Sequence, residues 1–336
     1  MTQGEKFTNR FAIILTVCII FLITAGSFVT STGSGLAVPD WPNTYGENMF
    51  LFPPSKWIGG IFYEHFHRLI ATTIGFLTII LTFLLKKYEP QNFVKKLGYI
   101  ALGLVILQGT LGGLTVLFLL PPAISISHAT IAQSFLCVVL SIAFFTSKFW
   151  KDERLNFNFK NGNNIYRFTV ISFFAVYLQL IFGATMRHLH AGLVVIDWPF
   201  YFGNLFPSLD EESLKNYNQI LIQNSPLLFS DGLITPFQIT IHFLHRTWAF
   251  VVVGLILTTS YKIFKNKNLN QTIKKTVITL IYILFLQFVL GILTIFSMKN
   301  FIIASIHVTV GAITLALTFL LLLQVWKSKN SKVIKL

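Results

Sequence analysis

Residues 11–31 read FAIILTVCIIFLITAGSFVTS and contain no charged side chain. A stretch of about 20 apolar residues is the length that an α-helix needs to cross the hydrocarbon core of a bilayer. No small-residue cleavage site closes this stretch, so we expect it to remain as a membrane-spanning helix. Similar stretches recur along the chain. We predict eight spans, at residues 11–31, 57–85, 97–119, 123–146, 166–187, 236–261, 274–297 and 301–326.

The composition agrees with a membrane protein. Hydrophobic residues make up 54% of the chain and charged residues only 11%, whereas about a quarter of a soluble domain is charged. The net charge of +14 could indicate nucleic-acid binding, but twenty of the 26 Lys and Arg residues fall in alternate loops. Positive loops remain on the cytoplasmic side. We therefore expect a multi-pass protein of a bacterial cell membrane, surrounded by lipid, with both termini cytoplasmic and no nucleic-acid partner.

The chain contains an internal repeat. GLAVPDWP at residues 35–42 returns as GLVVIDWP at residues 192–199. His67-Arg68 returns as His245-Arg246. A further set, Gln108, Gly112, Thr115 and His128, returns 179 residues later as Gln287, Gly291, Thr294 and His307. Self-similarity over such a distance indicates two units of the same structure.

Each repeat begins on the inner side and crosses the membrane four times, so the two halves have the same orientation. We predict an all-α integral membrane fold with eight transmembrane helices in two pseudo-symmetric four-helix bundles. The N-terminal half covers residues 1–147 and the C-terminal half residues 166–336. Residues 148–165 form a cytoplasmic linker between them.

Four histidines lie within predicted spans: His67 and His128 in the first half, and His245 and His307 in the second. Ionisable residues inside a membrane are costly and mark functional sites. The two histidines of each half lie at similar depths and can face each other across a bundle core. Two such imidazoles suit a six-coordinate haem iron, whereas zinc or copper gathers three or four ligands. We predict two haem sites, with a proton path or a transition-metal site as the other interpretations. His65 points about 200° away from His67, so only one of them faces the core.

Glu64 is the acid that lies within a predicted span, and it shares a helix face with His67. Its counterpart in the second half is His242. This difference predicts proton chemistry at the first site and electron transfer at the second, unless Glu64 only orients His67 or an arginine. Arg68 and Arg246 directly follow candidate ligands. Each could bind a haem carboxylate through two hydrogen bonds, or extend toward the membrane surface.

Two long outer loops complete the pattern. The repeated Asp-Trp-Pro segments at 40–42 and 197–199 are interpreted as structural, with a direct cofactor contact as the alternative. Residues 209–222 predict a loop helix whose apolar stripe lies on the membrane surface, with a lid over a site as the alternative. The stripe consists of Leu214, Tyr217, Ile220 and Leu221.

Several motifs together resemble the haem A synthase family over residues 11–326. They are GSGL at 33–36 with PDWP at 39–42, EHFHR at 64–68, RHLHAGL at 187–193 and HR at 245–246. The resemblance implies an enzyme that oxidises a ring methyl of haem O to a formyl group, giving haem A for terminal oxidases. It also implies haem O synthase and the oxidase assembly pathway as partners.

Residue roles follow from the same resemblance. It implies that His245 and His307 bind a haem b cofactor, that His67 and His128 bind the haem O substrate, and that Glu64 is the catalytic carboxylate. The resemblance also implies that Arg68, Arg187 and Arg246 contact the haems.

The chain departs from many relatives at three positions. Val38 and Thr44 stand where those relatives have a pair of cysteines, and Thr30 stands where they have arginine. No thiol step and no contact from position 30 are therefore assigned. Two other functions remain open: a dihaem cytochrome b that only passes electrons, and a transporter that uses Glu64 and the histidines as a proton relay.

Overall fold

The computed structural model describes residues 1–152, 162–224, 233–266 and 270–330. Within these residues, eight helices are long and apolar enough to cross a membrane, so the predicted number of spans is confirmed. They are α1 (Gln3–Ser31), α2 (Gly60–Tyr88), α3 (Asn92–Leu117), α4 (Pro122–Phe145), α6 (Gly162–His188), α8 (Pro236–Phe264), α9 (Gln271–Phe296) and α10 (Phe301–Asn330).

The ends of the helices differ from the predicted spans for identifiable reasons. Helix α1 begins at Gln3 because Thr2 and Glu5 form a capping box that satisfies the first free N–H groups. Helix α2 begins at Gly60, three residues later than expected. The preceding Gly59 has a φ of +57°, a left-handed backbone that glycine adopts readily and that interrupts the helix.

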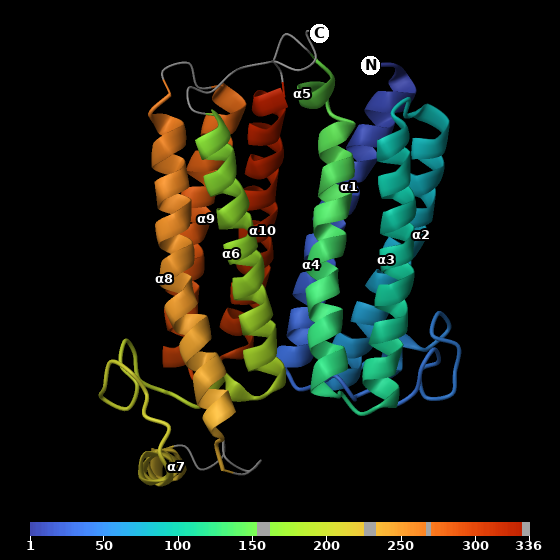
Figure 1. Cartoon of the computed structure of the whole chain (residues 1–336). Helices are drawn as coiled ribbons and strands as arrows, with labels where there is room; N and C mark the ends of the chain where they lie inside the picture. Colours follow the sequence, from blue (N-terminus) through green and yellow to red (C-terminus); the bar gives the residue numbers. More distant parts are fainter. Residues whose placement is uncertain (153–161, 225–232, 267–269, 331–336) are drawn as a thin grey trace.

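The helices form two groups that lie side by side (Figure 1), α1–α4 in one and α6, α8, α9 and α10 in the other. Helix α10 packs against α1 and α4 of the first group as well as α6 and α9 of its own. Its Ala312 and Ala316 belong to the apolar core of the first group, and Leu315 and Leu321 to that of the second. The two groups therefore share a helix-lined boundary in the middle of the molecule.

Hydroxyl groups line this boundary. Thr24 of α1 and Thr309 of α10 are hydrogen-bonded at 2.9 Å, and Ser305 of α10 donates to Ser31 Oγ at 3.0 Å. Ser27 Oγ donates to the Ser305 carbonyl at 3.3 Å. Small polar residues allow close approach of helices in a membrane and add hydrogen bonds across the contact.

The two outer loops lie at the opposite end of the bundles from the start of α1 (Figure 1). In the first loop, the Asp40 carboxylate accepts from the N–H groups of Tyr45 and Gly46 at 2.8 and 2.7 Å. In the second, Asp197 accepts from Phe202 and Gly203 at 3.1 and 3.0 Å. Both aspartates close the same turn, as the structural interpretation of the Asp-Trp-Pro segments predicts, and a cofactor contact from these segments stays a prediction.

The loop helix is α7 (Glu211–Asn224), close to the predicted range. Its apolar stripe does not face outward, however. Tyr217 and Leu221 are buried, and the Tyr217 ring stacks on Phe202 of the same loop with the ring centres 3.8 Å apart. The expectation that this stripe rests on a membrane was wrong, since the loop supplies its own apolar partners for the helix. The alternative of a lid stays a prediction.

Candidate functional site

The four histidines predicted as ligands share one local arrangement. Each lies roughly two turns inside its helix, and each is half-buried. Each imidazole also lies against a glycine of a neighbouring helix. The pairs are His67 on Gly26, His128 on Gly112, His245 on Gly183 and His307 on Gly291.

The glycines permit this close contact. A Cβ atom on Gly26 would lie 2.9 Å from His67 Cε1, and one on Gly183 would lie 3.0 Å from His245 Cε1. Such distances are too short for carbon atoms, so a side chain at either position would displace the imidazole. Two of the four glycines, Gly112 and Gly291, were part of the sequence repeat. Gly26 and Gly183 were missed, although they repeat with the same spacing as the Asp-Trp-Pro segments.

The structure brings the histidines together in the predicted pairs. His67 and His128 are close enough to interact electrostatically, and so are His245 and His307. The Nδ1 atoms of His67, His128 and His307 are buried and have no hydrogen-bond partner among the described residues. A buried polar atom without a partner requires an explanation, and backbone groups of Leu22, Gln108 and Gln287 lie close to these three rings.

Hydrogen bonds from two glutamines hold the histidine-bearing helices. Gln108 Nε2 donates to the His128 carbonyl and Gln179 Nε2 to the His245 carbonyl, both at 2.9 Å. The Gln179 Nε2 atom also lies 3.2 Å from His245 Nδ1. Gln179 was not identified from the sequence. The residue that corresponds to it in the first half is Leu22, so the repeat did not mark this position.

Glu64 has a different environment from the one its spacing suggested. One carboxylate oxygen accepts from Arg68 Nη2 at 2.6 Å, and the other accepts from the Val38 N–H at 2.8 Å. The side chain is 5% exposed. The carboxylate is thus bonded to an arginine, which was one interpretation of the sequence. It is also bonded to the first outer loop, which the sequence did not predict.

Arg68 joins the same loop to α2. Besides Glu64, it donates to the carbonyls of Val38, Asp40 and Asn43 at 2.9, 2.7 and 3.1 Å. Both of its terminal nitrogens are engaged by these contacts. The contact between Arg68 and a cofactor stays a prediction, and the contacts present here assign Arg68 to the loop and to Glu64.

Position 242 in the second half lacks this ion pair. His242 Nδ1 lies 2.8 Å from the Ala191 carbonyl, to which it can donate. Arg246 donates to the Phe200 carbonyl at 3.3 Å and stacks over Tyr201, with its Cζ 4.3 Å from the ring centre. Its buried Nη1 has no partner among the described residues.

Arg187 connects the two groups of helices. Its Nη2 donates to the Ser27 carbonyl and to Ser31 Oγ, both at 2.6 Å, while its buried Nε lacks a partner in the described part of the chain. Burial, together with the nearby charge of Arg187, lowers the pKa of Lys299. Arg187 also acts electrostatically on His307. Arg187 therefore lies near both His307 and Lys299, and the sequence did not predict this position for Lys299.

The remaining histidines have distinct positions. His65 faces the first outer loop, where its Nδ1 lies 3.2 Å from Thr44 Oγ1 and its ring packs on Trp57. The prediction that only one of His65 and His67 faces the core is confirmed. His188 of α6 is close enough to His128 to interact electrostatically, so the second half contributes a histidine to the surroundings of the first.

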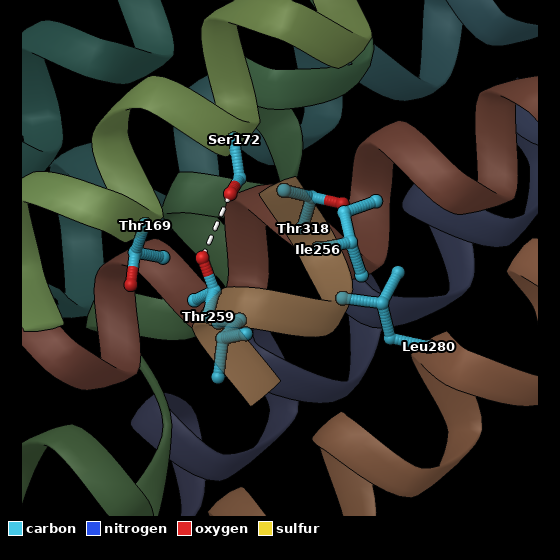
Figure 2. Close-up of a pocket in the computed structure, with 7 residues that line it drawn as sticks. Thr169, Ser172, Ile256, Thr259, Leu280 and Thr318 are labelled. Carbon is cyan, nitrogen blue, oxygen red and sulfur yellow. Dashed lines mark hydrogen bonds between the residues drawn. The ribbon is translucent and has the colours of Figure 1, made fainter. Parts of the chain in front are cut away.

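Other polar clusters do not compete with these sites. Within the described residues, no group of three or more His, Cys, Asp or Glu side chains could hold a metal ion. The hydroxyl-lined gap between α6, α8, α9 and α10 (Figure 2) contains a 2.9 Å hydrogen bond between Ser172 and Thr259. It has no room for a water molecule, so we interpret it as a packing gap.

Comparisons with known proteins identify relatives of this chain. The profile of the cytochrome oxidase assembly protein family matches residues 9–319. The chain is 28% identical to the haem A synthase of Flavobacterium psychrophilum, over 90% of this chain and 91% of that protein. It is 25% identical to the haem A synthases of Listeria welshimeri, over 98% of both chains, and of Shewanella oneidensis, over 84% and 85%. A match over nearly the whole length means that the chain belongs to the haem A synthase family of cytochrome oxidase assembly proteins.

Proposed function

We propose that this protein is an oxidoreductase that converts haem O to haem A by oxidising a ring methyl to a formyl group. The names of its relatives support this function. The observation that carries the proposal is that two similar histidine pairs lie in different surroundings. The first pair is beside the Glu64–Arg68 ion pair. The second is beside His242, Arg187 and Arg246, and each of these arginines has one N–H without a partner among the described residues.

His245 and His307 hold haem b in this proposal, and His67 and His128 hold the haem O substrate. The paired, half-buried imidazoles and their glycine neighbours fit such groups. Haem b, when bound, supplies an electron acceptor. Arg187 and Arg246 each retain a buried N–H without a partner among the described residues, which suits the binding of haem carboxylates.

Glu64 receives the role of proton acceptor. With water as the source of the formyl oxygen and an external electron acceptor, oxidation of a methyl group to a formyl group releases protons, so the substrate site needs a base. The Glu64 carboxylate accepts hydrogen bonds from Arg68 and from Val38 N, and these two bonds hold it in place. Protonation of Glu64 would weaken its bond to Arg68 and thereby loosen the loop that Arg68 holds.

A dihaem cytochrome b is the second candidate function. The observation in its favour is that Glu64 is bonded to the outer loop and to Arg68, which is a structural role. Purification of the chain from cells that make haem O, followed by identification of the extracted haems, separates the two functions. We expect haem O or haem A together with haem b. Haem b alone would favour the cytochrome, and a colourless protein would contradict both functions and favour a transporter.

The proposal includes the organisation and location of the chain. Residues 1–147 form the substrate half, residues 148–165 a cytoplasmic linker and residues 166–336 the haem b half, in a bacterial cell membrane. The proposed partners are haem O synthase, which supplies the substrate, and the terminal oxidase assembly pathway, which receives the product. A cysteine at Asn43 should react with an impermeant reagent from outside the cell only, because the first outer loop carries few positive charges. Labelling from the cytoplasm would contradict this orientation.

A further inference from the structure

An apolar groove lies between α1 and α2. Its volume is about 300 Å³. The lining residues are Cys18 and Phe21 on α1, Trp57 in the loop, and Phe66, Leu69, Ile70, Thr73, Ile74 and Leu77 on α2. Apart from the Thr73 hydroxyl, this lining offers aliphatic, aromatic and thiol surface. The groove therefore suits a flexible hydrocarbon chain and not a charged group.

The groove begins beside the histidine proposed to bind the substrate. Ile70 and Ile74 follow His67 by three and seven residues, so they share its face of α2. On α1, Cys18 lies about two turns from Gly26, the glycine under the His67 ring. The groove thus runs from the level of His67 toward the middle of both helices.

The corresponding position in the second half contains a large side chain. Trp248 follows His245 by three residues, as Ile70 follows His67. The Trp248 Nε1 donates to the Ala175 carbonyl at 2.9 Å. Ala175 precedes Gly183 by eight residues, as Cys18 precedes Gly26. An indole therefore spans the space between α6 and α8 that matches the groove between α1 and α2.

We propose that the α1–α2 groove binds the isoprenoid tail of the substrate porphyrin. The inference rests on the proposed function, which assigns haem O to the first half and haem b to the second. Haem O carries a long farnesyl-derived chain and haem b does not. The open groove with Ile70 and the filled one with Trp248 match this difference, and burial of a hydrocarbon chain is favoured in proportion to its apolar area.

The test transfers the residue of the second half to the first. Ile70→Trp should fill the groove, and the packing of Trp248 demonstrates that the repeat accommodates an indole at this position. Purified protein that retains haem b is titrated with haem O and, separately, with added haem b, which lacks the tail. Absorbance changes that disappear in His67→Ala report binding in the first half.

We expect Ile70→Trp to weaken haem O binding by about tenfold or more, with little change for the tail-less haem. Thr73→Trp, at the exposed edge of the groove, should act in the same direction if Ile70→Trp is poorly folded. Phe76→Trp is the matched control, since Phe76 is 62% exposed on the same helix and does not line the groove. It should bind haem O like the unmodified protein.

The possible results separate the inference from the proposed function. Unchanged haem O binding in both groove variants would overturn the tail site. Equal weakening of both haems would also overturn it, because the porphyrin pocket would then be damaged. Loss of co-purified phospholipid with normal haem O binding would identify the groove as a lipid site, which again contradicts the inference. Failure of the unmodified protein to bind haem O would overturn the proposed function itself.

Discussion

The two halves carry matching arginines, Arg68 and Arg246, whose hydrogen-bond partners differ. In the first half, Arg68 has four partners, the Glu64 carboxylate and three carbonyls of the outer loop. In the second half, the matching Arg246 has one hydrogen bond at 3.3 Å, a ring contact with Tyr201 and an unpartnered N–H among the described residues. In the second half an imidazole, His242, takes the place of the Glu64 carboxylate, and its Nδ1 lies 2.8 Å from the Ala191 carbonyl, so no anion at this position pairs with Arg246.

The difference indicates separate roles for the two arginines. Arg68 fastens the first outer loop to α2 and to Glu64. Arg246 keeps one N–H without a partner among the described residues. In the proposed function, the firmly held loop belongs to the substrate half and the arginine with the free N–H belongs to the haem b half.

The largest expected effect is the loss of haem b from one half only. His245→Ala or His307→Ala removes an axial ligand and should leave the purified protein without low-spin haem b. His67→Ala should retain it, because the first pair lies in the other bundle. Absorption spectra and extracted haem content measure both. Haem b retained in the first two variants would contradict the assignment of the halves.

A smaller but still large effect is expected at the ion pair. Glu64→Gln keeps the shape of the side chain and removes its charge, so haem A formation should fall about 10²- to 10⁴-fold. Haem O should accumulate, and haem b should be retained in the second half. His242→Gln is the matched control and should leave most activity. Normal haem A output from a well-folded Gln variant would exclude Glu64 as the base, and loss of haem b would assign it a structural role.

Stability should respond unequally to the two arginines. Arg68→Ala leaves the nearly buried Glu64 carboxylate without its cation, a change that costs about 3–5 kcal/mol. Arg246→Ala removes one long hydrogen bond and a ring contact, about 1 kcal/mol. Thermal unfolding in detergent, followed by protease cleavage of residues 32–59, compares the two variants. Equal losses of stability would mean that the two loops are held alike.

The smallest effect concerns acid sensitivity of the first loop. Burial raises the pKa of Asp40, but the Gly46 and Tyr45 N–H groups, with a contribution from Arg68, lower it to below its usual value. The stabilisation by Asp40 is therefore complete above the unfolded pKa and disappears as pH falls through the lower folded pKa. Protease cleavage of this loop should rise only below about pH 4. Asp40→Asn should remove that pH dependence, and a midpoint near neutral pH would contradict the assignment to Asp40.

Sequence patterns predicted much of this protein because each pattern reflects a local requirement. Spans follow from the length of apolar stretches, as at residues 11–31, and the pairing of His67 with His128 followed from depth and repeat. The orientation of Glu64 was not predictable in the same way. Its spacing from His67 is compatible with a bond to the histidine or to Arg68, and the loop carrying Val38 determines which one forms.

The sequence by itself determined the eight spans, the two histidine pairs and the position where the repeat differs, because hydrocarbon thickness and helical periodicity act within a single segment. Only the tertiary structure decided that Gly26 and Gly183 lie under imidazoles, that α7 packs on its own loop, and that Trp248 spans a space left open beside Ile70. These features depend on which side chains meet across helices distant in the chain, and packing at that level is set by three-dimensional complementarity.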